Sequence, residues 1–128
     1  MMKLLLVVFV GGGLGSLMRY GVQFILHERL LNTLFPWGTL GVNLLGSFLI
    51  GLFYAWSIRF NMSEEMRLFL ATGLCGGFTT FSTFSYENLM LLRQGSYSLF
   101  FLYVSASILL GIAAALGGGY IGTMYENK

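Results

Sequence analysis

Four long apolar segments alternate with short polar connections along the chain. They run from about residue 4 to 26, 38 to 58, 68 to 92 and 99 to 121. A membrane-spanning helix needs about 20 mainly apolar residues, and each segment reaches that length. The connections are too short to fold independently. The pattern therefore predicts an all-α membrane protein with four transmembrane helices, forming a single transmembrane domain over residues 1–128.

The third segment differs from the others because glycines and hydroxyl side chains interrupt it between Gly76 and Ser85. In hydrocarbon every backbone N–H and C=O needs an internal partner, so a broken helix survives only where it is buried in protein or lines a hydrated cavity. We therefore expect the third helix to break near its middle, around 76–80, and the protein to act in transport. Carbonyls freed by a break suit a small hard cation, and the donors after it suit an anion.

Composition supports the membrane class and argues against an enzyme. Hydrophobic residues make up 56% of the chain and charged residues 9%, against roughly a quarter charged in soluble domains. The chain has no Asp, one His in a connection and one Cys, so we expect neither a disulfide nor a catalytic cluster. The apolar start resembles a signal peptide but lacks a small-residue cleavage site, so it reads as a retained first helix.

The distribution of positive charge gives only a weak topological preference. With four spans, one side carries Lys3, Arg59, Arg67 and Lys128. The other carries Arg29 and Arg93, and Arg19 if it is counted there, which is a small bias under the positive-inside rule. Many transporters form their sites between inverted repeats, and this chain has no convincing internal repeat. Two copies inserted in opposite orientations would supply that symmetry, so we expect a dual-topology, antiparallel homodimer.

Glycine spacing indicates close helix contacts. Gly11 and Gly15, and again Gly118 and Gly122, are four residues apart. This spacing lets helix backbones approach each other in lipid. We expect both pairs to lie where two helices pack.

Polar side chains inside a membrane are costly, so each one predicts a function or a bonding partner. Arg19 either reaches a headgroup region, bonds to another helix or donates to a site. Asn43 has two N–H donors, and Thr39 lies one turn earlier on the same face. Both can donate to an anion, although Asn43 can instead join two helices. Glu87 is expected to be protonated, bonded to hydroxyls or near an aqueous vestibule.

Aromatic and hydroxyl side chains follow the glycines of the third segment. Phe81 and Phe84 are three residues apart, and their electropositive ring edges can face an anion without trapping it strongly. If the segment were helical throughout, its hydroxyl groups would form a second stripe, made of Thr79, Ser82, Thr83 and Tyr86. In the fourth segment, Tyr103 and Ser107 would continue a hydroxyl track.

These residues resemble the Fluc (CrcB) family of bacterial fluoride channels. The matching blocks are 11–20 (GGGLGSLMRY), 38–46 (GTLGVNLLG) and 73–87 (GLCGGFTTFSTFSYE). The resemblance spans essentially the whole chain, and the third block is its most specific part. It implies a multi-pass protein of the bacterial inner membrane, a dual-topology homodimer with two fluoride pores, and passive export of fluoride that confers resistance.

The resemblance also implies roles for individual residues. The fluoride pore would comprise Asn43, Phe81, Phe84, Ser82, Thr83, Tyr103 and Ser107. The backbone carbonyls of Gly76 and Thr79 would hold a structural sodium ion at the dimer centre. Further pore or vestibule candidates are Arg19, Thr39 and Glu87.

Two other functions are weighed against a channel. A small dual-topology multidrug or cation exporter would, by resemblance, have a membrane-embedded acid in its first span, and the segment from 4 to 26 has none. A structural or assembly subunit would not need the hydroxyl and phenylalanine run. No Walker-type phosphate loop is present, so we expect no use of ATP.

Overall fold

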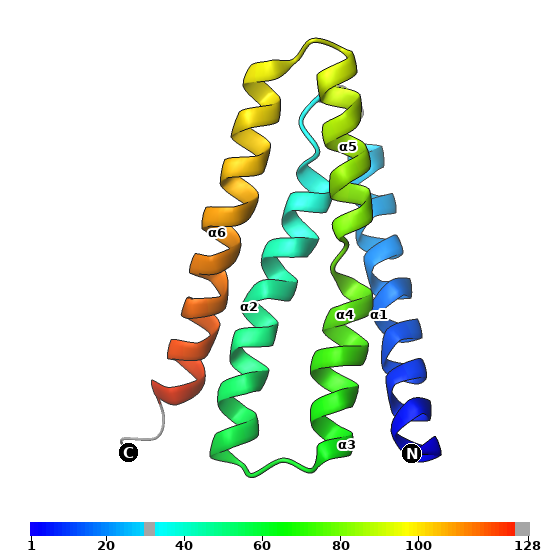
Figure 1. Ribbon diagram of the computed structural model, residues 1–128, viewed down its shortest axis with the longest axis vertical. Helices are drawn as coiled ribbons and strands as arrows, with labels where there is room; N and C mark the ends of the chain where they lie inside the picture. Colours follow the sequence, from blue (N-terminus) through cyan, green and yellow to red (C-terminus); the bar gives the residue numbers. More distant parts are fainter. Residues whose placement is uncertain (30–32, 125–128) are drawn as a thin grey trace.

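The computed structural model describes residues 1–29 and 33–124, and every regular element among them is a helix. Its elements are α1 (Met2–Arg29), α2 (Trp37–Arg59), α3 (Glu64–Arg67), η1 (Leu68–Cys75), α4 (Gly76–Phe78), α5 (Phe81–Arg93) and α6 (Tyr97–Thr123). The segments α3, η1, α4 and α5 follow one another as one interrupted helix beside the three continuous ones (Figure 1). The predicted all-helical fold with four long helices is confirmed.

The third helix is broken where the sequence pattern predicts. Among the described residues, α1, α2 and α6 are each long and apolar enough to cross a membrane. The third segment is divided because Thr79 and Thr80 adopt extended backbone angles, with ψ values of 160° and 117°. The break thus lies within the expected range 76–80. Ahead of it, η1 is a π-helix, which the hydrophobic pattern does not predict; such wide turns often occur at functional sites.

Small residues set how closely the helices pack. α2 packs mainly on α6, and α1 packs on η1 and α4. A Cβ added at Gly15 would overlap the carbonyl oxygen of Leu74, and one at Gly118 would overlap that of Phe48. Both predicted glycine pairs are buried at these contacts, which confirms their expected packing role.

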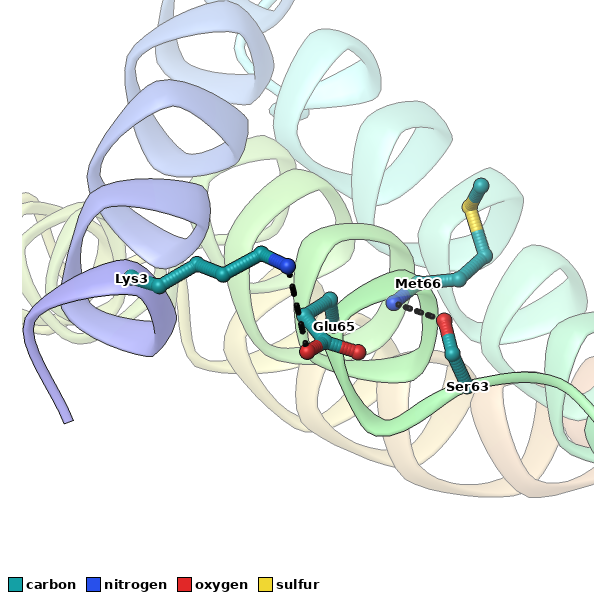
Figure 2. Close-up of polar contacts among 4 residues, drawn as sticks. All are labelled: Lys3, Ser63, Glu65 and Met66. Atoms are coloured by element: carbon teal, nitrogen blue, oxygen red, sulfur yellow. Dashed lines mark hydrogen bonds and ion pairs between the residues drawn. The ribbon is translucent and has the colours of Figure 1, made fainter.

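The start of α1, the C-terminal end of α6 and the α2–α3 connection lie at the same end of the molecule, opposite the α5–α6 turn (Figure 1). Lys3 Nζ lies 3.6 Å from Glu65 Oε1 and ties the start of α1 to α3 (Figure 2). Ser63 caps α3 by accepting a hydrogen bond from the Met66 N–H at 3.2 Å (Figure 2). The pKa of Glu65 is lowered, first by its own backbone N–H and then by the charge of Lys3.

The buried core of a single chain is small. It is centred on Leu40, Leu91 and Tyr103, from α2, α5 and α6. Large apolar side chains remain exposed along every long helix. A surface of this kind requires lipid or another protein against it. The core lies beside the broken helix and supports the residues described next.

Candidate functional site

The side chain of Asn43 holds the break in the third helix. Its Nδ2 donates to the Thr80 carbonyl at 3.1 Å, and its Oδ1 accepts from the Thr80 N–H at 2.8 Å. The amide therefore pairs with an extended residue as a neighbouring strand would, and it satisfies backbone groups that hydrocarbon leaves unpaired. Of the two roles weighed for Asn43, joining two helices is the one seen in this chain. An amide has a second N–H donor, and its role toward fluoride stays a prediction.

Backbone carbonyls lose their helical donors at the break, among them those of Gly76 and Thr79. In an α-helix the Thr80 N–H would bond to the Gly76 carbonyl, and the Thr83 N–H to that of Thr79. The Thr80 N–H instead donates to Asn43, and the Thr83 N–H donates to Thr80 Oγ1 at 3.2 Å. The expected freeing of carbonyls is therefore present at both predicted positions. That Gly76 and Thr79 hold sodium stays a prediction.

Arg19 lies beside the same break. Its Nε donates to the Gly77 carbonyl at 3.0 Å, and its side chain is half-buried between α1 and α4. Among the roles considered for Arg19, the structure shows the bond to another helix. The guanidinium also places positive charge next to the interrupted backbone. A pore or vestibule role for Arg19 stays a prediction.

A cavity of about 400 Å³ lies between α2, the break and α6. It brings together six of the predicted site residues, namely Asn43, Gly76, Thr79, Phe81, Phe84 and Ser107. The rings of Phe81 and Phe84 lie 5.7 Å apart, and Phe81 is 79% exposed. In the part of the chain that the structure describes, the buried Ser107 Oγ has no hydrogen-bond partner. Its hydroxyl therefore lies beside this cavity without a hydrogen-bond partner from the described residues.

A second cavity, of about 600 Å³, lies between the C-terminal part of α1, the start of α2 and α5. Among the predicted residues it is lined by Thr39, Thr83 and Glu87. Tyr103 is fully buried, and its hydroxyl donates to Glu87 Oε1 at 3.3 Å. The Tyr103 ring packs edge-on against Phe84, which lines the smaller cavity. Tyr103 therefore lies between the two cavities.

The hydroxyl stripe expected of a continuous helix does not form, because Thr79 lies in the break. Thr80 takes a different role as the N-cap of α5, where its hydroxyl also contacts Thr83 Oγ1 at 3.0 Å and Ser82 Oγ at 3.4 Å. Sequence reasoning missed this cap. The available signal was a threonine placed directly before the phenylalanine that begins the helix.

Gln23 was also missed. Its Nε2 donates to Thr39 Oγ1 at 3.1 Å, and it lines the larger cavity. Gln23 lies four residues after Arg19, near the end of the first apolar segment. A polar residue one helical turn beyond an intramembrane arginine is a signal that could have indicated it.

Comparison with known proteins decides the family. The family model described as "CrcB-like protein, Camphor Resistance (CrcB)" matches residues 6–119. The chain belongs to the CrcB family. It is 54% identical over 127 residues to the "Fluoride-specific ion channel FluC" of Bacteroides fragilis, covering 98% of this chain and 100% of that one.

Other proteins with the same description are similar over nearly as much of their length. That of Phocaeicola vulgatus is 50% identical over 117 residues, covering 91% of this chain and 96% of its own. The protein of Thermus thermophilus is 48% identical over 126 residues, which cover 94% of this chain and 100% of that one. The CrcB match contains every predicted site residue, from Arg19 to Ser107. The inferred resemblance and the multi-pass membrane location are therefore confirmed.

Proposed function

We propose that this CrcB chain is a fluoride-selective channel that lets fluoride leave the cytoplasm passively. The observation that carries the proposal is 54% identity, over 98% of the chain, to a protein described as a fluoride-specific ion channel. The geometry supports it, since two cavities lined by donors and aromatic rings lie on either side of Tyr103. A channel of this kind is not an enzyme and consumes no ATP.

The proposed path replaces water around the ion with protein donors. Fluoride is small and strongly hydrated, so selective passage requires hydrogen-bond donors in a pore too narrow for larger anions. Thr39 and Thr83 supply hydroxyls in the larger cavity, and Ser107 supplies one in the smaller. The ring edges of Phe81 and Phe84 carry weak positive potential, which attracts an anion without holding it.

A second copy of the chain would complete the site. One chain offers the Gly76 and Thr79 carbonyls, whereas hard cations such as Ca²⁺ take six or more oxygens. A sodium ion bound by these carbonyls would therefore draw further ligands from a partner. The 79% exposure of Phe81 also supports a partner, because a lipid-facing ring could not line a pore. We infer an antiparallel homodimer with structural sodium at its centre.

Replacing sodium by N-methylglucamine should lower the melting temperature of the protein, because the proposed ion would be lost from its centre. An unchanged melting temperature would contradict this.

Fluoride efflux from liposomes tests the channel directly. Purified protein is reconstituted in vesicles loaded with sodium fluoride, and released fluoride is followed with a fluoride electrode after the membrane potential is set with an ionophore. Rapid release, with chloride release at the level of protein-free vesicles, is expected. Fluoride release no faster than from protein-free vesicles would overturn the proposal.

Coupling to protons distinguishes the channel from an exporter. A passive channel releases fluoride down its electrochemical gradient whether or not a pH gradient is imposed. A proton-coupled multidrug exporter would instead move an organic cation in response to that gradient. The same vesicles loaded with ethidium separate the two functions.

A further inference from the structure

A polar cluster contributed by the four long helices lies beside the larger cavity. Its members are Gln23 of α1, Thr39 of α2, Glu87 of α5 and Tyr103 of α6. Thr39 is only 3% exposed, and its side chain lies close enough to Glu87 and Tyr103 to interact with both. Thr39 already belongs to the proposed path, Glu87 lines the larger cavity and Tyr103 lies between the two cavities. Gln23 reaches that path through Thr39.

The direction of the Gln23–Thr39 bond determines what Thr39 can do. A threonine hydroxyl has one hydrogen to donate and two lone pairs that accept. Gln23 Nε2 donates to Thr39 Oγ1 at 3.1 Å, so it occupies a lone pair and leaves the hydrogen free. The hydrogen can then be directed toward Glu87 or toward an anion in the cavity. A hydroxyl that also accepts a bond is a better donor, because linked hydrogen bonds polarise one another.

Without Gln23, Thr39 would have another use for its hydrogen. Threonine hydroxyls in helices commonly donate back to a carbonyl of the preceding turn. In that arrangement the hydrogen is bonded to the backbone of α2 and is not available to an anion in the cavity. The bond from α1 therefore selects the rotamer that faces the ion path.

We propose that Gln23 is a positioning residue, which orients the Thr39 hydroxyl as a donor to fluoride in the larger cavity. The inference rests on the proposed function, since it assigns the donor geometry of that same path. Gln23 acts only through Thr39. It therefore affects transport when residue 39 carries a hydroxyl and not otherwise.

A double-mutant cycle tests this dependence. Gln23→Met keeps the side-chain length and removes the N–H donor, and we expect it to lower fluoride flux by about fivefold, the factor that one neutral hydrogen bond supplies. In a Thr39→Ser background, which keeps the hydroxyl, Gln23→Met should lower flux by a similar factor. In a Thr39→Val background it should change flux by less than about 1.5-fold, because no donor remains to be positioned.

The control is Ser98→Ala, which removes a hydrogen-bonding side chain at an exposed position near the start of α6, outside both cavities. Its flux should equal that of the unmodified chain. Size-exclusion chromatography and circular dichroism establish that each variant is folded. Among folded variants, an equal loss from Gln23→Met in the Thr39→Val and Thr39→Ser backgrounds would overturn the inference, as would unchanged flux in Gln23→Met itself.

Fluoride release by the unmodified chain distinguishes failure of the channel function from failure of the positioning role of Gln23. If it releases fluoride and the cycle is additive, the positioning role fails and the channel stands. If it releases no fluoride, both fail. If flux is lost only where residue 39 has a hydroxyl, both are supported.

Discussion

Individual residues at the break divide into those that hold the backbone and those that face the cavities. Asn43 pairs with both backbone groups of Thr80, and Arg19 bonds to the Gly77 carbonyl. Phe81, by contrast, is 79% exposed and contributes little to the core of one chain. Substitutions at these two kinds of residue should therefore affect stability and transport differently.

Phe81→Ile is expected to reduce fluoride flux by about tenfold, equivalent to ~1.4 kcal/mol in the barrier. The branched side chain lacks the electropositive ring edge. The melting temperature should change little because the ring contributes little to the buried core and, in the proposed dimer, faces the pore. Phe101→Ile, a similar change at a residue 66% exposed on α6, serves as the control and should leave flux unaltered. Equal flux in both variants would remove Phe81 from the pore.

Asn43→Ala is expected to lower both flux and stability. It removes two hydrogen bonds and leaves the Thr80 N–H and C=O unpaired, which costs about 1–3 kcal/mol for each buried group. Thermal unfolding in detergent and fluoride efflux measure the two effects. A melting temperature unchanged in Asn43→Ala would contradict the bracing role.

At the scale of elements, helix contacts depend on residues without side chains. α2 and α6 approach closely at Gly51, Gly118 and Gly122, and the break packs on Gly46, where an added Cβ would overlap the Thr79 side chain. Because lipid is as apolar as the helices, such contacts rely on close packing of backbones. Their loss should separate the elements that bound the smaller cavity.

Gly118→Ala is therefore expected to destabilise the chain by about 1–3 kcal/mol, as overpacking does in other protein interiors. Its Cβ would meet the Phe48 carbonyl of α2. Gly117→Ala, one residue earlier on α6, is the matched control because nothing lies within 4 Å of its added Cβ. Melting temperatures in detergent compare the two. Equal melting temperatures of the two variants would show that the close contact between α2 and α6 at Gly118 does not determine the stability of the chain.

For the whole molecule, the proposed pair of copies in opposite orientations is supported by the weak charge bias, and the exposed apolar surface leaves room for a partner. If insertion is dual, each end of the protein lies on both sides of the membrane. A cysteine near one end would then be reached from the outside in about half of the copies, since neither orientation is strongly favoured by charge. A protein of single topology would be reached in nearly all copies or in almost none.

The test uses Ser98→Cys in a Cys75→Ser background, which keeps every charge. Ser98 is exposed near the start of α6, whereas Cys75 is buried. Spheroplasts are treated with a membrane-impermeant maleimide before and after permeabilisation. We expect the reagent to label about half of the copies before permeabilisation and the rest afterwards. Labelling of all or none at that stage would exclude dual topology.

Sequence patterns predicted most of the elements but less of their internal geometry. The four apolar segments, the break within 76–80 and the glycine contacts follow from hydrophobicity, helix interruption and residue size. The π-helix before the break, the Thr80 cap and the Gln23–Thr39 bond were not predicted. Each of these depends on which side chain from another turn or another helix reaches a backbone or hydroxyl group.

The sequence by itself determined that the chain crosses the membrane as helices and that the third helix is interrupted, because hydrocarbon imposes these features locally. The similarity of its motifs also determined the family. Only the tertiary structure decided how the break is satisfied, since Asn43 lies 37 residues from Thr80 along the chain. It likewise decided that Tyr103 lies between two cavities. Such pairings depend on how the helices pack, which the order of residues along the chain does not reveal.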